Sequence, residues 1–156
     1  MYYSIYTSPV GKLLIVSDGE SIYRLSFDLQ VKNATLNDDL AIFKKIKKYL
    51  DDYFSGKRVE FNFKLKPQGS DFRQKVWKIT SKIPYGETRT YGEIASEISP
   101  TMSAQAVGGA VGANPIVILI PCHRVLGKNN KLTGYSAGID KKIELLKIEN
   151  ILNYTI

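Results

Sequence analysis

Cysteine and histidine are nearly absent from this sequence. Its 156 residues include one of each, and the two are neighbours, Cys122 and His123. A single cysteine excludes a disulfide within the chain, and one cysteine with one histidine cannot complete the four-ligand site of a zinc finger. We therefore expect no bound metal, and the cysteine is either a small buried hydrophobic residue or a reactive thiol.

Long apolar runs and phosphate-binding loops are also missing. No stretch is long and apolar enough to span a bilayer, and the first residues lack the basic segment and apolar core of a secretion signal. No glycine-rich loop follows a predicted strand in the way that nucleotide cofactors require. We expect a cytoplasmic protein with no membrane partner and no cofactor.

The chain is basic, and both halves contribute to the excess. It has 22 Lys and Arg against 15 Asp and Glu, a formal net charge of +7. Residues 1–69 hold 11 basic and 8 acidic side chains, and residues 70–156 hold 11 and 7. This balance suits a polyanionic partner such as nucleic acid, but folding rather than a basic tail would have to assemble the binding surface.

The first part of the chain predicts a small α/β domain. A helix is expected from about Asp38 to Gly56, because apolar residues recur there at helical spacing, and Val59–Leu65 is a candidate strand. The segment Lys66–Gly69 is the best candidate for a boundary, so we predict domains at 1–66 and 67–156. Runs rich in β-branched and aromatic residues, separated by turns, predict a strand meander over Tyr3–Thr7, Leu13–Ser17 and Ile22–Phe27.

The second part predicts mainly helices. One begins at Ser70 and ends before Pro84, with Trp77 as a packing residue. The next follows Thr90, whose spacing to Glu93 is that of a capping box. A third short helix is expected over Ser103–Ala113, and two short helices joined by a tight turn are typical of a helix-turn-helix unit.

The helix over Ser103–Ala113 has an unusual composition. Three positions within five are glycine, Gly108, Gly109 and Gly112. Each glycine costs roughly 1 kcal/mol relative to alanine in a helix interior. Either a neighbouring helix packs closely against this one, or its smooth face is kept for another molecule, and the sequence leaves both explanations open.

The pair Cys122 and His123 follows Ile116–Ile120, an apolar run that predicts a buried strand. The thiolate is the nucleophilic form of cysteine, and a nearby imidazole can take the thiol proton. Neighbours in a regular strand face opposite sides, so contact requires a bridging water or a turn, which Pro121 favours. The pair could equally be two packing residues.

Glu149 lies near the end of the last predicted helix, Ile139–Asn150. The helix dipole disfavours a carboxylate at that end. The side chain could orient His123 and stabilise its charge, as the third member of a triad does. A solvated surface carboxylate is the alternative.

Several motifs together resemble the signature of the O6-alkylguanine-DNA alkyltransferase family. The central motif is Pro121-Cys122-His123-Arg124-Val125, which Asn114-Pro115 precedes and Gly134-Tyr135-Ser136 follows. Further motifs fall at the family's spacing up to the cysteine: Phe72, Val76-Trp77, Ile83-Pro84-Tyr85-Gly86 and Thr90-Tyr91. The match covers residues 69–149, whereas residues 1–66 agree only in outline.

The resemblance implies both a fold and a reaction. The fold is an α/β N-terminal domain of ribonuclease-H-like outline, a small antiparallel sheet plus a helix, followed by a mainly α domain with a winged helix-turn-helix-like unit. The reaction is DNA repair: a base is flipped from double-stranded DNA, and the alkyl group of O6-alkylguanine, or O4-alkylthymine, moves to Cys122. The transfer is single-turnover and self-inactivating, and we expect a monomer.

Catalytic roles follow from the same resemblance. Cys122 would accept the alkyl group, His123 would deprotonate it through a water, and Glu149 would polarise the histidine. Asn114 would hold the turn that shapes the active-site loop. Tyr91 would help to rotate the nucleotide out of the duplex and would donate a proton or hydrogen bond to the leaving guanine.

Substrate and DNA contacts are implied in the same way. The carbonyls of Cys122 and Val125 would accept from the guanine amino group, the Ser136 backbone would contact O6, and Tyr135 and Val111 would line the alkyl pocket. The DNA contacts would come from a recognition helix in the minor groove and from the arginine after the histidine: Ala104, Gln105, Ala106, Gly108, Gly109 and Arg124.

One position departs from the family pattern. Members usually place an arginine in the recognition helix, where it fills the gap left by the flipped base, and this chain has Gln105. We expect weaker DNA binding or slower flipping, with the chemistry intact. The chain also lacks the cysteines that hold a structural zinc in some relatives.

Three other functions are alternatives. An alkyltransferase-like damage sensor would bind the lesion without transfer, and the presence of Cys122 argues against it. A Cys–His hydrolase would turn over an ester or peptide, and its two residues are usually distant in sequence, unlike Cys122 and His123. A helix-turn-helix regulator would prefer a DNA sequence to a lesion.

Overall fold

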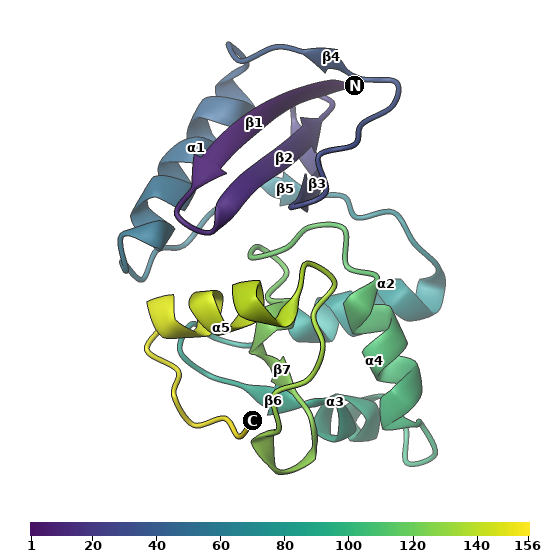
Figure 1. Cartoon of the computed structure of the whole chain (residues 1–156). Helices are drawn as coiled ribbons and strands as arrows, with labels where there is room; N and C mark the ends of the chain where they lie inside the picture. The colour runs from purple at the N-terminus through teal and green to yellow at the C-terminus, as the bar shows by residue number, and fades with distance from the viewer. The chain divides into compact units, whose positions relative to one another are not determined.

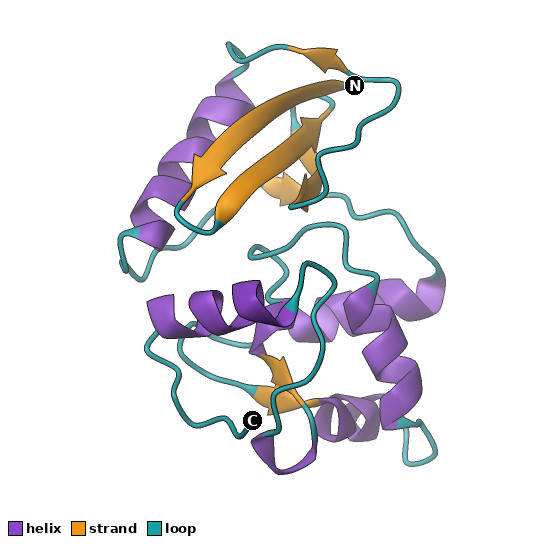
Figure 2. Cartoon of the chain, in the orientation of Figure 1, coloured by secondary structure: helices purple, strands orange, loops and turns teal.

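Two units make up the fold in the computed structural model, which describes residues 1–156. They are Met1–Gln68 and Gly69–Ile156. Strands and one helix form the first unit, and helices dominate the second (Figures 1 and 2). No helix combines the length and apolarity needed to cross a membrane.

The first unit is built on a five-stranded sheet of order β4-β1-β2-β3-β5. The three predicted meander strands are confirmed as β1 (Tyr2–Ser8), β2 (Gly11–Ser17) and β3 (Ser21–Ser26). β1 and β2 pair antiparallel, and Gly11 supplies the positive φ of their tight turn. The parallel edge strands are short, β4 at Thr35–Leu36 and β5 at Lys64–Leu65, so the strand predicted over Val59–Leu65 is reduced to its last two residues.

The helix α1 (Ala41–Phe54) lies along β1 (Figure 1). Its apolar side chains recur at helical spacing and are buried, as predicted: Ile42, Phe43, Ile46, Leu50 and Tyr53. The predicted start at Asp38 is wrong by three residues. The Asp38 carboxylate accepts a hydrogen bond from Ser4 Oγ at 2.5 Å and pairs with Lys47, so it joins strand to helix rather than capping α1.

Four helices and one small strand pair build the second unit. The helices are α2 (Asp71–Thr80), α3 (Tyr91–Ile98), α4 (Ala104–Gly112) and α5 (Ile139–Ile148). The strands β6 (Arg89–Thr90) and β7 (Val125–Leu126) pair in parallel. Hydroxyl side chains cap the first three helices, and the predicted capping box of Thr90 and Glu93 is confirmed. Trp77 is buried and its Nε1 donates to the Ala110 carbonyl at 2.8 Å, which joins α2 to α4.

The strand predicted over Ile116–Ile120 is wrong, although all five residues are buried. The segment folds into consecutive turns, with Leu119 N bonded to the Val117 carbonyl at 2.8 Å and Ile118 at a φ of 71°. The Asn114 side chain accepts from Ile116 N and donates to the Ile120 carbonyl. These two hydrogen bonds close the segment into a compact loop. An extended strand could not make both of them.

Candidate functional site

Cys122 begins a single turn of 3₁₀ helix, Cys122–Arg124, directly after Pro121. Only 4 % of the residue is exposed. It contributes to a pocket of about 40 Å³ whose other walls come from α3, α4 and the loop before α5: Tyr91, Gly108, Val111, Gly112, Gly134, Tyr135 and Ser136. A small volume beside a thiol suits a group of one or a few carbon atoms.

The surroundings of the Cys122 thiol have opposing effects on its pKa. Burial raises the pKa, whereas hydrogen bonds with the Asn114 and Tyr135 side chains and the positive charge of Lys142 lower it. Burial prevails, so the thiol is protonated at neutral pH. A nucleophilic reaction at this position therefore requires a base to remove the thiol proton.

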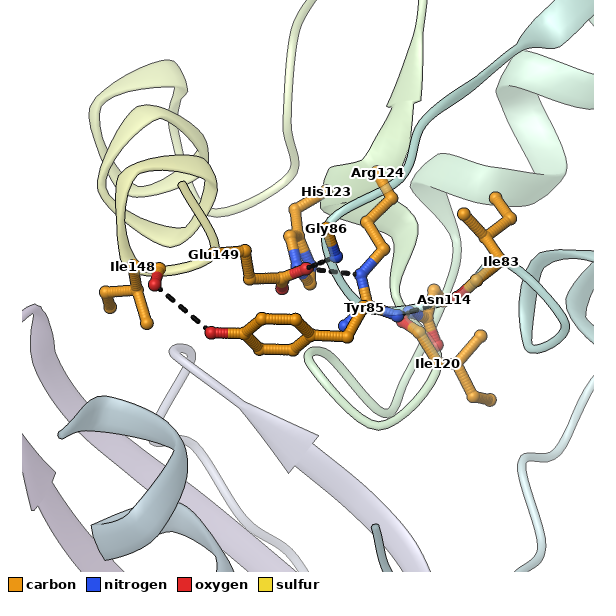
Figure 3. A network of polar contacts seen from close by, with 9 residues as sticks. All are labelled: Ile83, Tyr85, Gly86, Asn114, Ile120, His123, Arg124, Ile148 and Glu149. Atoms are coloured by element: carbon orange, nitrogen blue, oxygen red, sulfur yellow. Dashed lines mark hydrogen bonds and ion pairs between the residues drawn. The ribbon is translucent and has the colours of Figure 1, made fainter. Parts of the chain in front are cut away.

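His123, which follows Cys122 in the chain, forms a buried pair with Glu149 (Figure 3). His123 Nε2 lies 2.5 Å from Glu149 Oε2, and both side chains are inaccessible to solvent. Burial lowers the pKa of His123, and this effect outweighs the opposing effect of the glutamate. The neutral ring that results donates through Nε2–H, which places its basic lone pair on Nδ1.

Glu149 is the C-cap residue of α5, and its second carboxylate oxygen has partners of its own. Oε1 accepts from Arg124 Nε at 2.7 Å and from the Gly86 backbone N–H at 3.1 Å (Figure 3). Burial alone would raise the pKa of this carboxyl, but the hydrogen bonds from His123 and Arg124 and the positive charge of Arg124 hold that pKa well below its usual range. The carboxylate is thus ionised despite its unfavourable end of the helix dipole.

Arg124 does not occupy the position expected of a DNA contact. The residue is 8 % exposed, its Nη1 donates to the Ile83 carbonyl at 2.7 Å, and its guanidinium lies 5.8 Å from the ring centre of Tyr85. Because its Nε also donates to Glu149, the Arg124 side chain is held in the interior of the unit. The predicted DNA contact is corrected accordingly: Arg124 holds the glutamate of the buried pair.

Lys142 and Thr133 are site residues that the sequence analysis missed. Lys142 is fully buried in α5, and its Nζ donates to the Val125 carbonyl at 2.8 Å and to Thr133 Oγ1 at 3.4 Å. Thr133 Oγ1 also shares a hydrogen bond of 3.0 Å with the Tyr91 hydroxyl. A signal was available, because Lys142 lies three and four residues before the core positions Leu145 and Leu146 and so shares their helix face.

The buried ammonium of Lys142 is electrostatically connected to the cysteine. Burial lowers the pKa of Lys142 to about 8, and the negative charge of a Cys122 thiolate opposes this. A carboxylate is not among its hydrogen-bond partners. The positive charge is therefore positioned to stabilise a thiolate.

The glycines of α4 are not explained by packing within the chain. A Cβ atom added at Gly109 or Gly112 would meet nothing within 4 Å, and one at Gly108 would make only ordinary contact with the Tyr91 ring at 3.8 Å. Close packing of a neighbouring helix is thus excluded at two of the three positions. The helix instead buries Val107, Ala110 and Val111 and turns its small residues outward.

A second cavity, of about 520 Å³, lies beside the cysteine pocket. Tyr91 and Gly108 belong to both. The remaining walls come from the starts of α3 and α4 and from two loop residues: Thr90, Gly92, Ala104, Gln105, Lys128 and Thr133. Ala106 and Gly109 are exposed on α4 but line neither cavity.

Most of the predicted site residues therefore meet in one place. Tyr91, Val111, Tyr135 and Ser136 line the Cys122 pocket, and Asn114 spans the loop that leads to it. The Val125 carbonyl was expected to accept a hydrogen bond from the guanine amino group. It already accepts one from Lys142 Nζ, but its second lone pair can accept another. No three His, Cys, Asp or Glu side chains lie close enough together to hold a metal ion.

Known proteins are similar to this chain over nearly its whole length. Residues 71–151 match the family model "6-O-methylguanine DNA methyltransferase, DNA binding domain", and residues 1–67 match its "ribonuclease-like domain". A methylated-DNA–protein-cysteine methyltransferase of Haemophilus influenzae is 46 % identical over 97 % of this chain and 87 % of its own. A protein of the same name from Methanosarcina acetivorans is 44 % identical over 96 % of this chain and 98 % of its own.

A solved structure is similar in the same way. It is the Mycobacterium tuberculosis OGT in complex with DNA, which is 42 % identical and superposes with a TM-score of 0.89. The alignment covers 96 % of this chain and 92 % of that one.

Proposed function

Because the chain belongs to the 6-O-methylguanine DNA methyltransferase family, we propose that Cys122 is the residue that accepts the alkyl group in its DNA-repair reaction. The chain is a methylated-DNA–protein-cysteine methyltransferase, and Cys122 is its only cysteine. The observation that carries the assignment is the burial of this thiol in a small pocket, at the residue that directly precedes the histidine of the buried His123–Glu149 pair.

The buried pair prepares the nucleophile. Since Glu149 accepts a hydrogen bond from His123 Nε2–H, the other ring nitrogen, Nδ1, is the one that takes the thiol proton, through one bridging water. The thiol needs this base because burial keeps its pKa raised. The nearby Lys142 charge then stabilises the thiolate until it reacts.

The reaction itself is a direct displacement. Cys122 Sγ forms a bond to the alkyl carbon, the carbon–O6 bond breaks, and its electron pair stays on the guanine. Burial raises the pKa of Tyr91, so its hydroxyl keeps its proton at neutral pH and can donate it to the leaving base. A thioether is too poor a leaving group to regenerate the thiol, so each chain reacts once.

The outward face of α4 is proposed to lie in the minor groove of the damaged duplex. The helix pair α3–α4, with β6 and β7 beside it, would act as a winged helix-turn-helix-like unit, and one chain would act alone. Gly109 and Gly112 leave room that the chain itself does not use, which suits a groove about 6 Å wide. The flipped base would enter by the cavity beside Gln105 and Tyr91 and reach the cysteine pocket that shares Tyr91 and Gly108 with it.

Intact-protein mass spectrometry tests this assignment. The purified chain is mixed with an oligonucleotide that carries one O6-methylguanine. We expect a gain of one methyl group in place of a hydrogen, confined to the Cys122 peptide and saturating at one per chain. A Cys122→Ser variant should bind the lesion and gain nothing. Tight binding by the natural chain with no mass gain would instead indicate a damage sensor without transfer.

A further inference from the structure

The helix α1 and the segment that follows it carry most of the excess positive charge. Between residues 41 and 66 there are eight Lys and Arg but three Asp and Glu, an excess of five out of the net +7. The net charge of the first half of the chain does not reveal this concentration, because residues 1–40 offset part of it with three basic and five acidic side chains. The first unit therefore has a strongly basic region of its own, far along the sequence from Cys122.

A groove of about 550 Å³ lies in this basic region. It falls within the range of volumes that small-molecule sites occupy. Its lining residues come from one face of α1 and from the segment between α1 and β5. The lining residues include three lysines and three aromatic side chains: Lys44, Lys45, Lys48, Tyr49, Phe61 and Phe63.

The aromatic side chains form a fixed cluster in the groove. The Phe61 and Phe63 rings are stacked, with centroids 4.8 Å apart and planes at 17°. Tyr49 meets both of them edge-on, at 5.4 and 6.1 Å. All three residues are only half-buried, so part of this ring surface is open to a ligand.

The lysines beside the rings are available to a partner. Lys44 and Lys45 are exposed, and neither forms an ion pair. Lys48 and Lys57 both pair with Asp52, at 3.0 and 3.5 Å, and so neutralise one of the two acidic residues that line the groove. The groove is left with a positive balance.

We propose that this groove binds unpaired, single-stranded DNA, with bases against the aromatic cluster and phosphates at the lysines. Stacking rings in a positively charged groove are the combination that single-stranded nucleic acid requires. Paired DNA would offer its phosphates to the lysines but not its base faces, which are stacked within the duplex. An acidic peptide would meet the lysines and leave the rings unused.

An NMR titration of the full-length ¹⁵N-labelled chain with hexathymidylate tests the proposal. Because each amide reports separately, binding at this groove is distinguished from binding at the Cys122 site. We expect shifts concentrated in residues 44–63. The outcome does not depend on alkyl transfer, since the oligonucleotide carries no lesion.

Variants give the groove a matched comparison. Removing two phosphate contacts in Lys44→Gln/Lys45→Gln should reduce the slope of log affinity against log salt by about 1.4. The control, Lys12→Gln/Lys32→Gln, removes the same charge from exposed positions of the same unit that do not line the groove. Phe63→Leu keeps an apolar side chain but removes one ring face, and we expect about tenfold weaker binding.

Four results would overturn the proposal. Shifts confined to Gly69–Ile156 would show that the groove is unused. Equal losses in the two double-lysine variants would show that only net charge matters. Equally strong shifts of the groove amides with a fully paired duplex or with hexaglutamate would reject the single-strand assignment, and tighter binding of hexauridylate would replace DNA by RNA.

Discussion

Replacing Glu149 with glutamine tests the buried pair most directly, because the change is nearly isosteric. The carboxylate accepts from His123 Nε2 and from Arg124 Nε at 2.5 and 2.7 Å. The Glu149 and His123 side chains are inaccessible to solvent, and that of Arg124 is only 9 % exposed. A glutamine has one oxygen and one NH₂ group, so it can accept from only one of them. A buried guanidinium would then lack its counter-charge.

The expected loss of stability is large. Breaking a buried ion pair by removing one partner costs about 3–5 kcal/mol. Because Glu149 has a depressed pKa in the folded chain, its contribution is complete above the ordinary glutamate pKa of about 4.3 and is lost as the pH falls through the folded value. The difference between natural chain and variant should thus be greatest at neutral pH and should narrow below about pH 4.

Urea denaturation at pH 7 and pH 3, followed by Trp77 fluorescence, measures both effects. Single-turnover methyl transfer should slow by about 10² or more, the usual range for a disabled general base. Adding Arg124→Met to Glu149→Gln removes the unpaired charge, so stability should partly return while transfer stays slow. Equal stability of Glu149→Gln and the natural chain at pH 7, or rescue of both properties together, would refute this account of the pair.

Three further predictions concern the neighbouring residues. Tyr91→Phe should slow transfer about 10²-fold in a rapid-quench assay, with little change in unfolding free energy; an unchanged rate would remove Tyr91 from the chemistry. Lys142→Met should raise the unfolding free energy at pH 7 by about 1–3 kcal/mol, since the folded chain depresses this pKa to about 8, and should slow transfer by removing the charge beside Cys122. Because the folded pKa lies below the ordinary value, the natural chain should gain stability between pH 8 and about 10.4, a gain that Lys142→Met should lack in denaturation curves. Gln105→Arg should tighten binding to the methylated duplex and steepen its log–log salt dependence by about 0.9, and an unaltered affinity and transfer rate would contradict the role inferred for this position.

Local signals in the sequence were sufficient for most of the fold. The meander strands, the capping box at Thr90 and Glu93, and the packing role of Trp77 depend on side chains near one another along the chain or on strong apolar periodicity. Two predicted elements were wrong because a polar side chain next to each one makes hydrogen bonds that the apolar pattern does not reveal. The Ile116–Ile120 run was apolar enough for a strand, but it belongs to neither sheet, and the Asn114 side chain holds it in turns. The first helix was expected to begin near Asp38, but that carboxylate is bonded to Ser4 and Lys47, and α1 begins at Ala41.

The site was predictable where motif spacing specified it and not where distant parts of the chain meet. Cys122, His123 and Glu149 followed from the resemblance. Arg124 was assigned to DNA on the resemblance alone, and only the fold brings Ile83 and Glu149 to its guanidinium. Lys142 was missed because a lysine in an amphipathic helix is expected to face solvent.

The open glycines of α4 bear on how this protein should be engineered. Nothing in the folded chain would resist a methyl group at Gly109 or Gly112, and alanine at each would favour the helix by roughly 1 kcal/mol. A laboratory selection for heat resistance alone would accept both substitutions at once. If this face docks in a DNA groove, the variants with alanine at these two positions would be more heat-stable but would repair poorly. Such a selection therefore needs a counter-screen for repair of damaged duplex from its first round.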